Sequence, residues 1–179
     1  KWIAFSKADY TRNTDVYLMP SAGGEEKKVT FDSYADLNPR FSPGGRKLYF
    51  VRNEGGGGGG QPSAQIYAVG LEREDKDPND PEMRADQSDS GDQEATPRRA
   101  GPTQRNQPPH ETNIDWAGLK PRTRQITRIP FPVFNYEIAP DSGTIVFVTT
   151  EPAATRNVPV IYSIQEDGRR LTRVTTGAA

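Results

Sequence analysis

The residue types that most often carry catalysis are scarce in this chain. Its one histidine, His110, follows Pro108-Pro109 in a stretch with almost no apolar side chains, so a general base there would lack a rigid support and an orienting partner. The sequence contains no G-x-S-x-G, no paired-histidine metal motif and no cysteine. We therefore interpret His110 as a surface residue and predict no catalytic, cofactor-binding or metal-binding residue in this chain.

Polar residues elsewhere have the composition of a ligand site without its spacing. Residues 55–60 are all glycine but lack the lysine and Ser/Thr of a phosphate loop, so a flexible hairpin tip explains them better. The acidic residues of 72–94 lack the ligand spacing and central glycine of a calcium loop, and they indicate a solvated linker. Asp9, Asn13 and Asp15 are expected to bond to the backbone of their own loop, with a ligand role as the alternative.

Five aromatic residues could form a stacking platform for sugars or bases: Trp2, Trp116, Tyr17, Tyr67 and Tyr162. The tyrosines, however, recur at equivalent positions of successive strand-like segments. Recurrence of this kind favours packing in the core over binding of a ligand.

The elements that must position these residues recur three times, with an offset of about forty residues between clean copies, as in the blades of a propeller. Each copy joins an apolar strand to a second strand that ends in tyrosine. The copies are residues 2–5 with 15–17, 48–51 with 65–67, and 144–148 with 160–162. In the first and last copies a Val-Thr pair follows this tyrosine at the same spacing, at 29–30 and at 174–175.

Turn residues separate the expected strands. Pro43-Gly44-Gly45 and the segment 140–143 supply the fixed φ and the tolerated positive φ that a tight hairpin needs. A second type of turn, at 22–24 and 166–168, ends in Gly-Gly or Asp-Gly. The chain is therefore expected to form small antiparallel sheets.

The pattern of apolar residues indicates how these sheets pack. Residues 48–51 and 145–148 are apolar at consecutive positions, so we expect both faces of each sheet to be covered by a neighbouring sheet. Residues 25–30 and 169–174 alternate charged and apolar side chains and are expected at the outer, solvated rim.

The composition sets further limits on the chain. A hydrophobic content of 32% with 16 prolines and 17 glycines is lean for 179 residues, so part of the chain is expected to be unpacked. The formal net charge of -1 excludes binding of nucleic acid or an anionic membrane by bulk charge. No apolar stretch approaches the roughly 20 residues that span a bilayer. The chain begins and ends within a repeat, and we interpret it as a fragment.

We predict an all-β chain, a partial β-propeller of about three four-stranded antiparallel blades with a long disordered insertion. The expected units are a partial blade at 1–31, a blade formed by 36–71 together with 113–130, and a blade at 133–177. Residues 72–112 interrupt the second unit. This segment is nearly free of apolar side chains and cannot offset its ordering entropy by burial.

Residues 39–53, with the sequence PRFSPGGRKLYFVRN, resemble the WD40-like repeat found in TolB and in the propellers of tricorn proteases. Residues 5–19, together with Gly23-Gly24 and Val29-Thr30, are similar to the same repeat. One departure is Gly44, where the usual repeat carries aspartate. The backbone, rather than a side-chain cap, is therefore expected to hold this turn.

Residues 113–130, followed by Asn135-Tyr136, are similar to a segment of bacterial tricorn-like peptidases in which a strand of pattern I-D-x-x-G-I/L leads to an arginine-containing strand. That segment accommodates a variable insert just before it, where residues 72–112 fall. The resemblance implies a non-catalytic propeller segment of a large serine peptidase, which guides or filters peptide substrates and supports assembly. The family's catalytic serine, histidine and glutamate positions do not fall in this chain, so no catalytic residue is carried over.

Two other functions stay open. A TolB-like propeller would be a protein–protein interaction module in the cell envelope, and a dipeptidyl-peptidase-type propeller would be fused to an α/β-hydrolase domain, although residues 114–128 fit that family poorly. The expected partners are peptides or proteins and other blades and domains of the same chain, with a homo-oligomer also open. No cofactor, nucleic acid or membrane insertion is expected. The bacterial periplasm and cytoplasm are equally compatible with the sequence.

Overall fold

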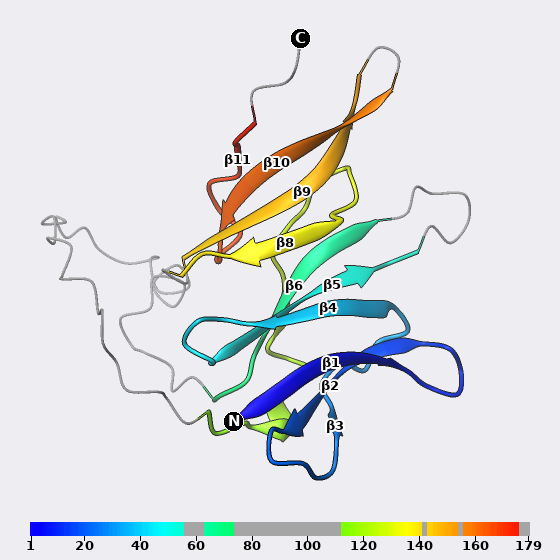
Figure 1. The fold of residues 1–179 in the computed structure, drawn as a ribbon, viewed down its shortest axis with the longest axis vertical. Helices are drawn as coiled ribbons and strands as arrows, with labels where there is room; N and C mark the ends of the chain where they lie inside the picture. Colours follow the sequence, from blue (N-terminus) through cyan, green and yellow to red (C-terminus); the bar gives the residue numbers. More distant parts are fainter. Residues whose placement is uncertain (56–62, 74–111, 141–142, 154–155, 176–179) are drawn as a thin grey trace, which may run out of the picture.

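The computed structural model describes residues 1–55, 63–73, 112–140, 143–153 and 156–175. These residues form three antiparallel sheets that are stacked one on the next, with the first sheet at one end and the third at the other (Figure 1). The prediction of an all-β partial propeller is confirmed. The expected insertion, residues 72–112, lies outside the described residues over 74–111, as do residues 56–60 of the glycine run.

Each sheet is built from consecutive strands in chain order. The first sheet contains β1 (Trp2–Ala8), β2 (Thr14–Pro20) and β3 (Lys27–Lys28). The middle sheet contains β4 (Ala35–Phe41), β5 (Lys47–Asn53), β6 (Ala64–Gly70) and β7 (Thr123–Gln125). The third sheet contains β8 (Asn135–Ile138), β9 (Thr144–Pro152), β10 (Asn157–Gln165) and β11 (Thr172–Arg173).

The predicted turns form where the sequence places them. In the β4–β5 turn Gly45 has φ +70°, and its N–H donates to the carbonyl of Ser42 at 2.8 Å. In the β10–β11 turn Gly168 has φ +82°, and its N–H donates to the carbonyl of Gln165 at 2.9 Å. Positive φ at these positions favours glycine. Residues 141–142 of the β8–β9 turn lie outside the described residues.

One aromatic contact recurs in all three sheets. A phenylalanine on one strand pairs directly with the tyrosine opposite it on the next strand, and the two rings stack with centroids 5.8–6.0 Å apart. The pairs are Phe5–Tyr17, Phe50–Tyr67 and Phe147–Tyr162. Such pairs stabilise neighbouring strands beyond simple burial. The recurrence of tyrosine in the sequence therefore reflects packing.

A second recurring contact joins each outer strand to the strand beside it. A backbone N–H donates to the Oγ1 atom of a threonine just beyond the short pairing of the outer strand. The pairs are Val16–Thr30, Ile66–Thr127 and Ile161–Thr175, at 3.0, 2.8 and 3.1 Å. In the middle sheet this bond fixes β7 against β6, although about 50 residues of sequence separate these two strands.

The middle sheet is covered on both faces, as predicted for residues 48–51. Leu48 and Phe50 of β5 pack into a cluster that includes Val16 and Leu18 of the first sheet. Their neighbours along the strand point the other way, into a cluster of the middle and third sheets. That cluster contains Tyr49, Val51, Ile66, Ala68, Ile126, Val133, Tyr136, Ile145, Phe147 and Ile164.

The outer face of each end sheet is open. In the third sheet Val146 and Val174 are 37% and 55% exposed, whereas Ile145 and Phe147 are buried. The expectation that both faces are covered is therefore wrong for residues 145–148, because among the described residues the third sheet has a neighbour on one side only. In the first sheet Ile3 is likewise exposed.

The segment that follows the insertion also differs from the expectation. The tricorn-like resemblance implies a strand at 114–119, but the structure has the 3-10 helix η1 (Trp116–Gly118) there. Ile114 and Leu119 are both buried in the cluster between the first and middle sheets, and the turn brings them to the same cluster. The arginine-containing strand of the resemblance is β7, which includes Arg124.

Candidate functional site

The first strands of the middle and third sheets, β4 and β8, form a polar surface at the free edges of these sheets. Tyr136 Oη donates to the carbonyl of Asn38 at 2.8 Å, and Asn38 Nδ2 donates to Asn135 Oδ1 at 3.1 Å. Arg40 Nη2 lies 3.0 Å from Glu137 Oε1. We call these five residues the β4–β8 surface.

The backbone of β4 is irregular where it carries this surface. Asn38 has φ +54°, Pro39 follows it, and the register of β4 against β5 shifts between Leu37 and Arg40. Proline has no N–H to donate, and bulges interrupt pairing at sheet edges. The free edge of β4 is therefore a poor template for an added strand, so a partner has to be recognised through the side chains.

Charge and burial differ sharply across the β4–β8 surface. Tyr136 is buried, and burial raises the pKa of its hydroxyl. The Arg40 guanidinium lies 5.8 Å from the centroid of the Tyr136 ring, at cation–π distance. Glu137 is 67% exposed, whereas Arg40 Nε is buried and has no hydrogen-bond acceptor within the described part of the chain.

A shallow groove adjoins the arginine. Its lining residues come from the ends of β4 and β8 and from the β4–β5 turn: Arg40, Phe41, Pro43, Glu137 and Ile138. The groove thus combines apolar side chains with one positive and one negative group. Such a mixture suits a segment of polypeptide better than a wholly polar or wholly apolar ligand.

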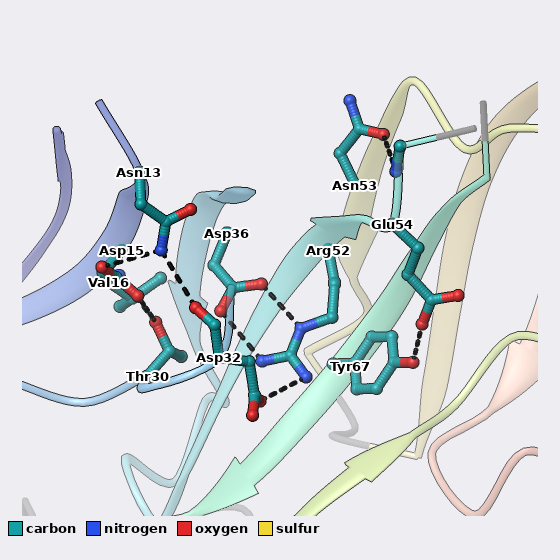
Figure 2. A network of polar contacts seen from close by, with 11 residues as sticks. Asn13, Asp15, Val16, Thr30, Asp32, Asp36, Arg52, Asn53, Glu54 and Tyr67 are labelled. Atoms are coloured by element: carbon teal, nitrogen blue, oxygen red, sulfur yellow. Dashed lines mark hydrogen bonds and ion pairs between the residues drawn. The ribbon is translucent and has the colours of Figure 1, made fainter. Parts of the chain in front are cut away.

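A second polar cluster surrounds Arg52 of β5 at the junction of the first and middle sheets (Figure 2). Arg52 Nε and Nη2 donate to the two carboxylate oxygens of Asp36 at 2.8 and 2.9 Å, and Nη1 lies 2.7 Å from Asp32 Oδ2. The guanidinium lies 4.6 Å from the centroid of the Tyr67 ring, whose hydroxyl donates to Glu54. The cluster ties the segment before β4 to the strands of the middle sheet.

Burial of the Arg52 cluster indicates a structural role. The side chains of Arg52 and Asp36 are 7% and 0% exposed, so neither presents a charge to solvent. Burial raises the pKa of Asp36, and the hydrogen bonds from Arg52 oppose this rise. Burial disfavours the charged form of Arg52, but the carboxylates of Asp36 and Asp32 keep its pKa above the ordinary value.

Of the three Asx residues Asp9, Asn13 and Asp15, Asp9 bonds to the backbone of its own loop, as predicted. Asp9 Oδ1 accepts from the N–H groups of Thr11 and Asn13 at 2.8 and 3.1 Å. The Thr11 hydroxyl donates to the same oxygen and contributes most to the lowered pKa of Asp9, and the two backbone bonds lower it further.

The prediction is wrong for the other two: Asn13 Nδ2 donates to the carbonyl of Asp32 at 2.9 Å, and Asp15, within β2, contacts the side chains of Lys28 and Thr30. Asp15 is fully buried and lies 2.6 Å from Lys28 Nζ.

The other candidates from the sequence do not form a ligand site. Trp2 and Trp116 pack edge to face with ring centroids 5.6 Å apart, and both, like Tyr67, pack against the hydrophobic cluster between the first and middle sheets. His110 lies outside the described residues, as do residues 74–94 of the acidic segment. Glu72, which precedes them, accepts from the N–H of Asn113 at 3.1 Å. Within the described ranges, no three His, Cys, Asp or Glu side chains gather as metal ligands would.

Sequence reasoning missed the β4–β8 surface. A signal was present, because Arg40 and Glu137 precede Phe41 and Ile138, which are equivalent in the repeat. Equivalent positions of neighbouring copies lie one above the other when the copies stack, so opposite charges at such positions are close enough to pair. The repeat therefore indicates that Arg40 and Glu137 come close, but it does not show on which face of its strand each side chain lies.

No helix among the described residues is long and apolar enough to cross a membrane. No family model matches the chain. A stretch of 37 residues, 21% of this chain, is 49% identical to a protein TolB homolog of Chlorobium chlorochromatii (strain CaD3), of which it covers 8%.

Solved structures with the same fold include two proteins of low sequence identity. A putative TolB from Agrobacterium tumefaciens superposes with a TM-score of 0.57 at 16% identity, over 98% of this chain and 45% of that one. The tricorn protease superposes with a TM-score of 0.53 at 13% identity, over 97% of this chain and 17% of that one. The chain thus spans less than half of either structure, and the likeness shows the propeller fold.

Proposed function

We propose that this chain is a non-catalytic β-propeller segment that binds an extended peptide or protein segment on the β4–β8 surface. The observation that carries the proposal is the row of polar side chains at the free edges of two adjoining sheets, beside a groove of mixed character. The bulge at Asn38-Pro39 directs recognition to side chains, because it interrupts the backbone edge.

The favoured setting is a tricorn-like serine peptidase, in which the segment would guide or filter peptides and support assembly. Similarity to the tricorn protease structure supports this setting, as does the arginine-containing strand β7 of the resemblance, whereas the strand that the resemblance implies at 114–119 is absent. The second candidate is a TolB-like module that binds a protein partner in the cell envelope. The 49% identity to a TolB homolog over 37 residues favours it. The two settings differ in domain content, because a PDZ-like domain and a serine peptidase domain in the same protein would support only the first.

Site-specific photocrosslinking tests the location of binding. A benzophenone amino acid placed at position 137 of the β4–β8 surface is expected to capture labelled, unstructured peptides from solution. The matched control carries the same group at position 169, where Arg169 is 75% exposed in the turn between β10 and β11. Equal capture at the two positions would refute the assignment of the surface, since exposure alone would then explain it.

A further inference from the structure

Arg40 of β4 and Arg52 of β5 differ in the contacts that the Nε and Nη2 atoms of their guanidinium groups make. Arg52 donates from Nε and Nη2 to both oxygens of the Asp36 carboxylate. Arg40 uses Nη2 alone, toward Glu137 at 3.0 Å, and its Nε has no acceptor within the described residues. The bidentate arrangement is the stronger one and the one that guanidinium geometry favours. On Arg40, therefore, only Nη2 of these two nitrogen atoms lies near an acceptor among the described residues.

The ion pair between Arg40 and its present partner, Glu137, is weak. Glu137 is 67% exposed, and exposed ion pairs contribute little to stability because solvent screens them. A buried N–H without an acceptor, by contrast, is unfavourable. Replacement of Glu137 by a carboxylate that accepts from both Nε and Nη2 would remove this deficit.

We propose that Arg40 is the receptor for a carboxylate of an extended peptide, which displaces Glu137 and lies with its neighbouring residue against Phe41 and Ile138. This inference rests on the proposed peptide-binding function and specifies its chemistry. The Tyr136 ring, with its centroid 5.8 Å from the guanidinium, orients Arg40, and the groove beside Arg40 leaves room for the neighbouring residue of the peptide. Glu137 then acts as a competing internal ligand.

Titration of ¹⁵N-labelled protein, followed through the Arg Nε–H resonances, tests the proposal. The probes are unstructured Gly/Ser/Leu peptides with one Glu or one Gln, each with a free or an amidated C-terminus. A carboxylate-containing peptide is expected to shift the Arg40 resonance, and the peptide without any carboxylate is not. The four peptides distinguish a side-chain carboxylate from the C-terminal one.

Variants separate a carboxylate receptor from general charge attraction. Glu137→Gln is expected to tighten binding by about two- to fivefold, because the internal competitor contributes no more than an exposed ion pair. Arg40→Gln is expected to abolish saturable binding. The control Arg173→Gln removes an arginine that is also 36% exposed and paired with a glutamate at 3.1 Å, and it is expected to leave binding unchanged.

Weaker binding to Glu137→Gln, or unchanged binding to Arg40→Gln, would overturn the proposal. If peptides still bind to Arg40→Gln, with resonances of the β4–β8 surface shifting, the proposed function survives and only its carboxylate chemistry fails. If no peptide shifts any resonance of the surface in the parent protein, both fail. Circular dichroism of each variant confirms that the sheets are retained.

Discussion

Removal of the Arg52 side chain is expected to destabilise the chain severely. In Arg52→Met the Asp36 carboxylate remains fully buried but loses both of its guanidinium donors. Breaking a buried ion pair from one side costs about 3–5 kcal/mol, because an uncompensated charge is left behind. That is a large share of the ~5–15 kcal/mol by which domains are stable.

The double variant Arg52→Met/Asp36→Leu isolates the cause of this loss. It removes the stranded charge together with its partner, and replacement of a buried pair by apolar residues is often close to neutral. We expect the double variant to be more stable than Arg52→Met by about 2 kcal/mol or more. The control Arg173→Met breaks a half-exposed pair with Glu151 and should cost no more than about 1 kcal/mol.

The dependence on pH supplies an independent check. Without Arg52, burial raises the Asp36 pKa further above its unfolded value, so the folded state binds a proton more tightly than the unfolded state does. The loss in Arg52→Met should therefore be largest above this raised pKa and should shrink as the pH falls through it. Urea denaturation at several pH values measures both effects. A loss below about 1 kcal/mol, or one that grows on acidification, would refute the burial argument.

Three further outcomes are expected. Thr30→Val removes a buried acceptor of a backbone N–H and should cost about 1–3 kcal/mol in urea denaturation, with a smaller loss for the less buried Thr175→Val. In Gly118→Ala the new Cβ would lie 2.0 Å from Arg122 Nη1, so Arg122 should swing away from Asp115. In the parent protein the Asp115 pKa is lowered chiefly by the hydrogen bond with Arg122, so in the variant an NMR titration should give a pKa closer to the ordinary value. The free energy of unfolding should therefore fall less in the variant than in the parent as the pH drops below about 4. The purified chain should not hydrolyse unstructured peptides, and hydrolysis that persists in a protease-free preparation would overturn the non-catalytic proposal.

The features that the sequence predicts well are those that packing repeats. The tyrosine on the second strand of each copy recurs because it stacks on a phenylalanine in every sheet. The turns at Gly45 and Gly168 can be predicted from the sequence because their positive φ angles favour glycine. Consecutive apolar residues at 48–51 report a sheet with two covered faces.

Other features depend on contacts that no local pattern encodes. Thr127 is the counterpart of Thr30, but its partner Ile66 lies 61 positions away because the insertion separates them. The 3-10 helix at 116–118 follows from burial of the residues on either side of it, and the bond from Arg122 to Asp115 holds this turn. The β4–β8 surface needs two strands from different sheets, so spacing along the chain does not reveal it.

The pairing of β6 with β7 across a connection of some 50 residues has a practical consequence. The register of β7 is set by contacts at the strand itself, including the bond from the Ile66 N–H to Thr127. Loop-closure entropy grows only logarithmically, so doubling this connection would cost roughly 0.6 kcal/mol. A reporter domain inserted between Arg73 and Thr112, which retains Glu72 and its bond with the Asn113 N–H, should thus leave the three sheets intact and offers an attachment point for labelling the protein.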